Sequence, residues 1–104
     1  MLPFLAQGAA QAIEDGATLA SELDKISKVE EIEQALKNYQ KRRMRRVQTI
    51  QIGARSIGET WHFPDGDEQE ERDAQMRAKD DHNPNKWSDQ EFQHWLFGWN
   101  AFTD

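Results

Sequence analysis

Residues 27–61 read SKVEEIEQALKNYQKRRMRRVQTIQIGARSIGETW and predict one long helix. Ser27 and Glu30 have the spacing of a capping box, in which a Ser hydroxyl and a Glu carboxylate satisfy two free amides of the first turn. Apolar side chains then recur at steps of three or four residues, which is the helical period. They are Ile32, Leu36, Tyr39, Val47, Ile50, Ala54, Ile57 and Trp61, with Arg43 as the one interruption. We expect a helix of about 25–30 residues that frays or kinks near Gly53 or Gly58.

The stretch from Ala9 to Leu23 predicts a second helix with a face of small side chains. The least polar residues recur at three- and four-residue steps, and most of them are Ala or Gly. They are Ala9, Ala12, Ile13, Gly16, Ala20 and Leu23. Small side chains let another backbone come close but fill little of a core. We therefore expect this face to pack on a partner surface and, in the isolated chain, to favour self-association.

Shorter elements are predicted for the last part of the chain. Residues 64–67 and 82–85 contain Pro with Gly or Asn, and both stretches predict breaks. Residues 68–81 between them are charged and nearly lack apolar anchors, which fits either a solvated helix or disorder.

The C-terminal segment predicts one more helix, of about ten residues. Ser88 and Glu91 have capping-box spacing, and Trp87 and Phe92 are placed as a hydrophobic staple around that cap. The expected aromatic and aliphatic packing surface consists of Phe92, Trp95, Leu96 and Trp99. No run with the period of a strand is longer than a few residues, so the predicted class is all-α.

Composition bounds the kind of protein. The 104 residues carry a formal net charge of -6 and no Cys, which excludes a disulfide scaffold, a thiolate zinc site and a Cys nucleophile. No apolar run approaches the roughly 18 residues of a membrane span, and residues 1–6 are too short for a signal peptide. The acidic balance argues against nucleic-acid binding. We expect a cytoplasmic chain with a thin core that depends on a partner or on a larger fold.

Three polar features have a structural interpretation. The basic run of residues 41–46 is expected to be a solvated helix flank, although such a run can also meet phosphates. Glu14 and Asp15 are adjacent and point apart on a helix, and we expect them to act as a cap or to pair with an Arg. The three histidines lack metal-ligand spacing, so no metal site is expected. They are His62, His82 and His94.

The junction at Gly8 is the candidate functional feature. A Gly at the start of a helix leaves the first amides, those of Ala9 and Ala10, uncovered and allows close approach to them. A helix N-terminus also carries partial positive charge, which suits an anion or an electron-rich carbonyl. The alternative is a plain loop-to-helix junction without a ligand, and the residues alone leave both interpretations open.

Residues 1–16, MLPFLAQGAAQAIEDG, resemble a signature of FAD-dependent aromatic-ring monooxygenases, nearest to the salicylate hydroxylase-like group. In that family a strand ends in Gly-Asp, followed by Ala-Ala-His, a Pro-containing loop, Gln-Gly and a helix that holds Glu-Asp. Tyr39-Gln40-Lys41-Arg42-Arg43 resembles part of the family's long helix. Asn83-Pro84-Asn85-Lys86-Trp87 and residues 92–98 resemble the ending of fungal-type members. By this resemblance the chain begins just after the His and corresponds to the C-terminal part of the enzyme.

The resemblance implies a helical C-terminal portion of an α/β FAD-binding, glutathione reductase-like fold. Residues 1–60 would then be the end of the FAD-binding domain, and residues 61–104 an acidic helical extension. The family uses NAD(P)H to reduce FAD, which reacts with oxygen and hydroxylates an aromatic acid. The Pro loop would lie beside flavin and substrate, and the helix start would direct amides at the flavin pyrimidine edge. The implied cofactor-binding residues are Pro3, Gln7, Gly8, Ala9 and Ala10, and no catalytic residue is implied.

The chain also departs from the family pattern. It contains no Gly-x-Gly-x-x-Gly unit for the FAD pyrophosphate, and the family's Gly-Asp pair that comes before Ala-Ala-His is absent. The remainder of the flavoprotein fold is therefore the expected partner, and the 104 residues alone are expected to be inactive. The alternative is a small non-catalytic helical module that binds another protein through its Ala face and its Trp cluster.

Overall fold

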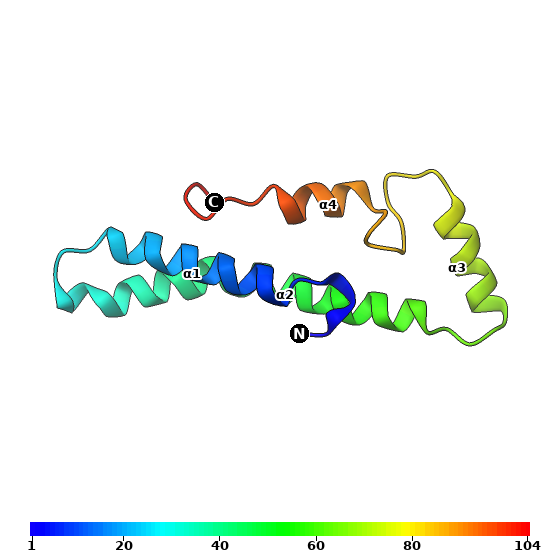
Figure 1. The fold of residues 1–104 in the computed structure, drawn as a ribbon, viewed down its shortest axis with the longest axis horizontal. Helices are drawn as coiled ribbons and strands as arrows, with labels where there is room; N and C mark the ends of the chain where they lie inside the picture. The colour runs from blue at the N-terminus through cyan, green and yellow to red at the C-terminus, as the bar shows by residue number, and fades with distance from the viewer. The chain divides into compact units, whose positions relative to one another are not determined.

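The computed structural model describes residues 1–104, and all of its regular elements are helical (Figure 1). Two single-turn 3-10 helices and four α-helices follow one another along the chain. They are η1 (Pro3–Leu5), α1 (Gly8–Asp24), η2 (Val29–Glu31), α2 (Ile32–Trp61), α3 (Asp67–Arg77) and α4 (Gln90–Phe97). The predicted all-α class is confirmed. So is the predicted order, in which two main helices are followed by short C-terminal elements.

The chain divides into two compact units that share α2. One unit consists of Ala6–Ile50 with Asn100–Asp104, and the other of Met1–Leu5 with Gln51–Trp99. The predicted division at residue 60 separates the end of an FAD-binding domain from a C-terminal extension. The two compact units do not test that division, and it stays a prediction.

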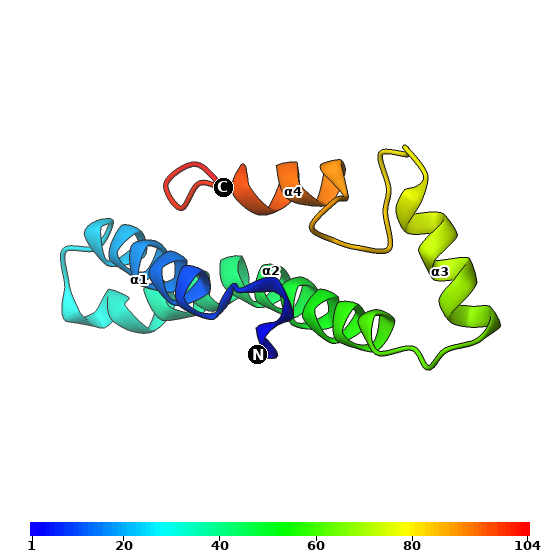
Figure 2. The ribbon, with the colours of Figure 1, turned by 45° about the vertical axis from the view of Figure 1, so that its right-hand side comes forward.

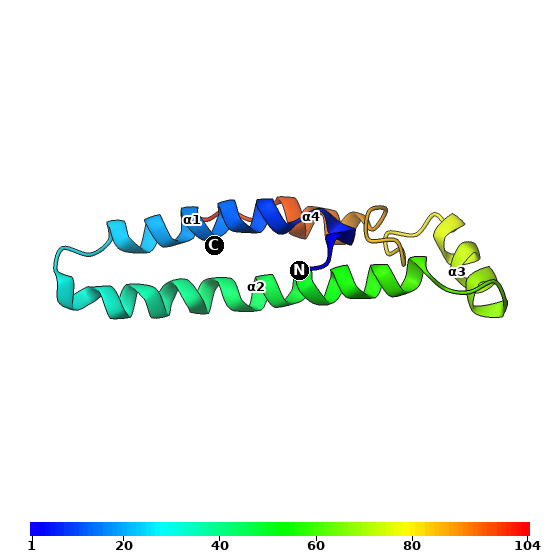
Figure 3. The same ribbon diagram turned by 60° about the horizontal axis from the view of Figure 1, so that its bottom comes forward.

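The unit built on Ala6–Ile50 is a helical hairpin. Figure 3 shows α1 alongside the first half of α2, joined by the short connection that contains η2. Thr18 on α1 and Ile50 on α2 have no exposed surface, and Ala35 is also buried. These apolar contributions are small, and the rest of the hairpin interior is polar.

The unit built on Gln51–Trp99 has the larger apolar core. It contains the second half of α2, η1, α3 and α4, and Figure 2 shows the long loop that leads from α3 to α4. Its fully or nearly fully buried side chains are Leu5, Ala54, Ile57 and Leu96. These four residues come from three elements that are distant in sequence, so the core closes only when all three pack.

The entry into α2 differs by one residue from the predicted capping box. Glu31, rather than Glu30, reaches back, and its Oε2 accepts from the amides of Ser27 at 2.9 Å and Lys28 at 3.0 Å. The reason is that the helix starts through the 3-10 turn η2, which makes Lys28 the cap residue and Glu31 the third helical position. Once formed, α2 runs 30 residues without interruption through Gly53 and Gly58, where we expected fraying or a kink.

The C-terminal elements also refine the expectations. Most of the charged stretch forms the helix α3, which has no buried residue. Three acidic residues lie in its first turn, where their negative charge interacts favourably with the helix dipole. The cap of α4 is Asp89 rather than Ser88, because the Asp89 carboxylate accepts the Phe92 amide at 2.9 Å. The helix has 8 residues against about ten predicted, and it ends before Trp99.

No helix of the structure is both long enough and apolar enough to cross a membrane.

Candidate functional site

The Pro loop forms a single 3-10 turn, η1, before a sharp change of direction. Pro3 starts the turn, and Leu5 ends it with 1% of its surface exposed. Ala6 follows with φ 50°, and it is the one residue other than Gly with positive φ. This left-handed conformation costs a residue with a Cβ about 1–2 kcal/mol, and such strained positions cluster at functional sites.

The start of α1 is uncovered, as the sequence predicted. Gln7 occupies the cap position, no side chain caps the helix there, and no acidic residue lies in the first turn. Gly8 and Ala9 are exposed, and Ala10 is half-buried. The positive end of the helix dipole therefore faces solvent without a compensating charge.

Gly8 itself has an ordinary helical backbone. Positive φ falls on Ala6, two residues earlier, and not on Gly8. A Cβ built at Gly8 meets nothing within 4 Å, so nothing within this chain requires Gly at that position.

The Gln7 side chain connects the helix start to a buried arginine. Gln7 is 6% exposed, and its Oε1 accepts from Gln11 Nε2 at 3.1 Å. Gln11 Oε1 in turn accepts from Arg43 Nη2 at 2.6 Å. A continuous polar chain thus runs from the first turn of α1 to the middle of α2, and it holds Gln7 by its side chain rather than leaving it free to cap the helix.

The expectation of a solvated flank for residues 41–46 holds for Lys41 and Arg45, which are exposed, but is wrong for Arg43 and Arg46, which are buried ion-pair partners. Arg43 is 3% exposed and binds Glu14 Oε2 through Nη1 and Asp15 Oδ1 through Nε, each at 2.7 Å. Arg46 is 5% exposed and holds both Glu14 oxygens, at 2.7 and 2.8 Å. The expected pairing of Glu14 and Asp15 with an Arg is confirmed. Burial opposes the charged form of Glu14, but hydrogen bonds from Arg46 and Arg43 outweigh burial and lower its pKa.

A second ion pair closes the other part of the hairpin. Glu22 is 4% exposed, and its Oε1 accepts from Lys25 at 2.9 Å and from Arg42 Nη1 at 2.8 Å. Arg42 also donates to the Ala101 carbonyl, which ties the C-terminal residues to this unit. The Lys25 hydrogen bond, partly opposed by burial and assisted by Arg42, lowers the pKa of Glu22. The hairpin is therefore held mainly by charge pairing.

The apolar stripe of α1 faces solvent, because the buried side of the helix is the polar one. Gln11, Thr18 and Glu22 are the buried residues of α1. All six stripe residues are exposed: Ala9, Ala12, Ile13, Gly16, Ala20 and Leu23. Ile13 alone leaves 73% of its surface exposed. Most of this face is therefore uncovered within the chain, although Leu23 is only 39% exposed.

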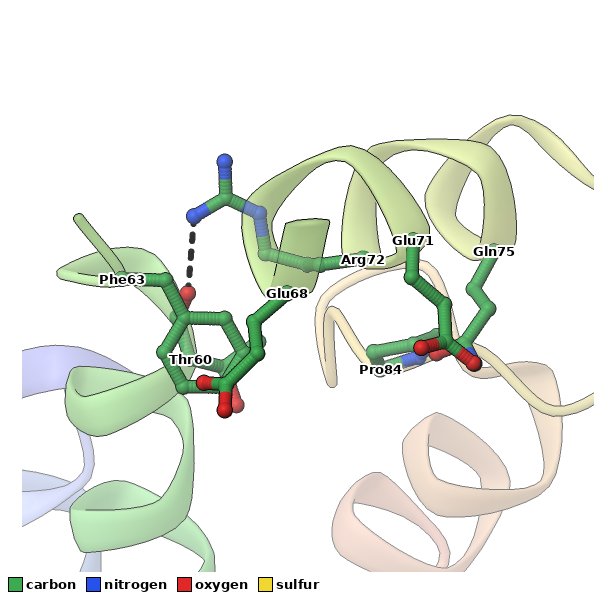
Figure 4. A pocket seen from close by; sticks show the side chains of 7 residues that line it. All are labelled: Thr60, Phe63, Glu68, Glu71, Arg72, Gln75 and Pro84. Atoms are coloured by element: carbon green, nitrogen blue, oxygen red, sulfur yellow. Dashed lines mark hydrogen bonds between the residues drawn. The ribbon is translucent and has the colours of Figure 1, made fainter. Parts of the chain in front are cut away.

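A cavity of about 320 Å³ lies between the end of α2 and α3, and none of the predicted site residues lines it (Figure 4). Its lining includes the Phe63 ring and the carboxylates Glu68 and Glu71. Arg72 donates to the Thr60 carbonyl at 2.9 Å, which is the hydrogen bond drawn in Figure 4. No group of three or more His, Asp or Glu side chains in the structure is arranged to hold a metal ion.

The buried polar network was missed in the sequence, although a signal for it exists. Gln7, Gln11, Glu14, Thr18 and Glu22 recur at steps of three or four residues, as a stripe on one side of α1. Arg43 occupies a position in the apolar series of α2. On an amphipathic helix such positions face the interior, so a charged residue there is expected to be buried. A polar stripe on one helix and a charged interruption on the next together indicate an ionic helix-helix interface.

Comparison with known proteins connects this chain to flavoenzymes. It is 38% identical to an FAD-dependent monooxygenase from Beauveria bassiana over 99% of its own length and 25% of the relative's. It is 38% identical to a 3-amino-4-hydroxybenzoate 2-monooxygenase from Streptomyces cremeus, over 83% of this chain and 21% of the relative. An FAD-dependent monooxygenase from Arthrinium sp is 41% identical over 75% of this chain and 18% of the relative. No family model and no solved structure matches the chain.

The resemblance seen in residues 1–16 therefore extends along the chain and is confirmed. By sequence, this chain belongs with the FAD-dependent monooxygenases. It spans about one quarter of the length of the relative from Beauveria bassiana and about one fifth of the other two.

Proposed function

We propose that this chain is part of an FAD-dependent monooxygenase that hydroxylates an aromatic acid with NAD(P)H and oxygen. In this proposal it supplies one rim of the flavin site and a surface for the rest of the flavoprotein fold. The rim residues are Pro3, Gln7, Gly8, Ala9 and Ala10. A cytoplasmic location remains part of the proposal.

The observation that carries the proposal is the uncovered start of α1. No side chain caps the helix and no acid lies in its first turn, so the amides of Gly8, Ala9 and Ala10 can meet a ligand. A helix N-terminus stabilises negative charge by about 0.3–1 kcal/mol when exposed and up to about 2 kcal/mol when partly buried. Reduced flavin is anionic near its pyrimidine edge, and amide donors would stabilise that charge. No heavy atom of the chain lies within 4 Å of a Cβ built at Gly8, so a ligand can approach the backbone there.

When bound, FAD would accept hydride from NAD(P)H and activate oxygen. The chain's own contribution is to orient and to stabilise. The Gln7 side chain is hydrogen-bonded to Gln11, and the Oε1 atom of Gln11 accepts a hydrogen bond from the buried Arg43. The first turn of α1 is thereby tied to a rigid ionic hairpin, so its amides are preorganised before a ligand arrives.

The rest of the flavoprotein fold is the proposed partner of the exposed stripe of α1. The chain spans only about a quarter of the length of its relative from Beauveria bassiana, and the stripe is apolar, small-sided and uncovered. Small side chains allow close helix packing, and burial of Ile13 and Leu23 would add apolar contact. An aromatic acid is the proposed substrate because one relative is named for the monooxygenation of 3-amino-4-hydroxybenzoate.

A hybrid enzyme tests the proposal. The present chain replaces the matching segment of the relative from Beauveria bassiana, and FAD content and NAD(P)H oxidation are measured with and without aromatic acids. We expect stoichiometric FAD and NAD(P)H oxidation stimulated by an aromatic acid. A folded hybrid that does not bind FAD would contradict the flavin-rim assignment. A flavin-bound hybrid that no aromatic acid stimulates would contradict the substrate class.

A further inference from the structure

The Pro loop is seated on the second half of α2 by two side chains. The Phe4 ring covers Gly58 so closely that a Cβ there would lie 2.5 Å from the ring. The Trp61 ring meets the same Phe4 ring edge-on, with centroids 6.0 Å apart. Leu5 reaches the position of a Gly53 Cβ at 3.4 Å and is 1% exposed. The two glycines of α2 thus make room for the loop. This close packing is the reason that α2 has glycine at positions 53 and 58.

The backbone of the loop is held from the C-terminal segment. Trp87 Nε1 donates a hydrogen bond of 3.0 Å to the Phe4 carbonyl, across 83 residues of sequence. Phe92 of α4 lies 3.8 Å from the position of a Gly53 Cβ, which is also where Leu5 packs. The side chains of the loop therefore rest on α2, and the hydrogen bond from Trp87 holds the Phe4 carbonyl.

The loop that carries Trp87 is itself internally braced. Asn83 is 7% exposed, and its Nδ2 donates to the Met76 carbonyl at the end of α3, at 3.1 Å. Asn83 Oδ1 accepts the Asn85 amide at 2.9 Å, and Asn85 Oδ1 accepts the Trp87 amide at 3.3 Å. Two successive side-chain turns thus fix the backbone up to Trp87. The Asn-Pro-Asn-Lys-Trp stretch therefore holds the backbone that leads to Trp87. This role is separate from the helices and from the proposed flavin rim.

We propose that Trp87 is a positioning residue, which orients the Pro loop through the Phe4 carbonyl. The inference rests on the proposed function for the statement that this loop borders flavin, but the clamp itself is a property of the chain. Ala6 follows Phe4 by two residues and holds the strained φ of 50°. A fixed Phe4 peptide opposes relaxation of that strain, because the chain cannot swing away from α2 before Ala6.

Trp87→Phe tests the clamp, because it keeps an aromatic ring and removes the donor. Trp61→Phe is the matched control: Trp61 is 42% exposed against 44% for Trp87, also contacts the loop at Phe4, and donates no hydrogen bond from its indole. Backbone amide exchange and chemical shifts of residues 4–6 are recorded by NMR in the 104-residue chain, with the free energy of unfolding measured alongside. We expect Trp87→Phe to speed exchange in residues 4–6 about two- to tenfold, the effect of one lost hydrogen bond.

The same two variants are then placed in the hybrid enzyme. Faster exchange for Trp87→Phe only, followed by slower flavin reduction with FAD retained, supports both the clamp and the flavin rim. Faster exchange with unchanged flavin reduction upholds the clamp and contradicts the flavin-rim assignment. Equal exchange in the two variants overturns the clamp whatever the flavin does. The clamp is also overturned if both variants lose the same unfolding free energy and neither changes residues 4–6 specifically. The Trp87 indole would then act only through packing.

Discussion

Arg43 Nη1 lies 2.7 Å from Glu14 Oε2, and this pair is the centre of the hairpin formed by α1 and the first half of α2. The arginine is almost completely buried, and the carboxylate also receives Arg46. Loss of the shared carboxylate of Glu14 is expected to be costly, because the two guanidinium groups would stay buried with less compensation.

Glu14→Ala is predicted to destabilise the chain by about 3 kcal/mol, because it leaves two buried guanidinium groups without their shared carboxylate. Asp15→Ala is the matched control. The Asp15 side chain is 39% exposed against 21% for Glu14, so its loss should cost less, about 1 kcal/mol or below. Urea unfolding followed by circular dichroism measures both variants, and equal losses would show that the Glu14 network is not central.

Acid is predicted to destabilise the chain through Glu14 and Glu22. The pKa of each is lower in the folded chain than its usual value of 4.5. Their stabilisation is therefore fully present above about pH 4.5 and is lost as the pH falls through the lower folded pKa values. Unfolding free energy measured from pH 7 to pH 3 should fall below pH 4.5. Glu14→Gln should flatten this decline, and a wild-type stability that does not change across the range would contradict the account.

Ile13→Glu is predicted to reduce self-association of the isolated chain without loss of stability. Ile13 is 73% exposed on the apolar stripe, and a charge there opposes contact between two such faces. Val29→Glu is the control, because Val29 is 78% exposed but lies in η2, outside the stripe. Sedimentation over a range of concentrations compares the two. A similar effect of both substitutions would remove the stripe as the associating surface.

The isolated chain is predicted not to retain FAD. The glycine-rich unit that normally contacts the pyrophosphate is not in these 104 residues, and one rim of amides cannot replace it. Purification in excess FAD followed by gel filtration is the measurement. A stoichiometric yellow complex after the column would show that the chain holds more of the flavin site than we propose.

The fold could be predicted from periodicity, whereas its interior could not. Helix positions followed from the apolar series of α2 and from breaks at Pro and Gly, but caps moved by one residue to Glu31 and Asp89. Such shifts arise because neighbouring residues can cap equally well, and tertiary packing selects between them. The burial of Arg43 could not be read from the spacing of α2 alone, since it depends on carboxylates of another helix.

The site was predicted in part, and for a specific physical reason. The uncovered helix start at Gly8 follows from local sequence, since it needs only a missing cap. The strained residue proved to be Ala6, with φ 50°, and Ala is not a turn residue that predicts this conformation. The contact between Trp87 and Phe4 joins residues 83 positions apart, and no local pattern announces it.

The flavin midpoint potential of Gly8→Val in the hybrid enzyme is the measurement that tests the central claim most directly. Gly8 has helical φ and open space around it, so the chain itself tolerates Val, while the branched Cβ blocks close approach to the amides of Ala9 and Ala10. We predict a more negative potential, because anionic reduced flavin would lose about 0.3–2 kcal/mol of stabilisation from the helix start. Gly8→Ala should give a smaller shift in the same direction. An unchanged potential with full flavin occupancy and unchanged stability would contradict the assignment of Gly8, Ala9 and Ala10 to the flavin site.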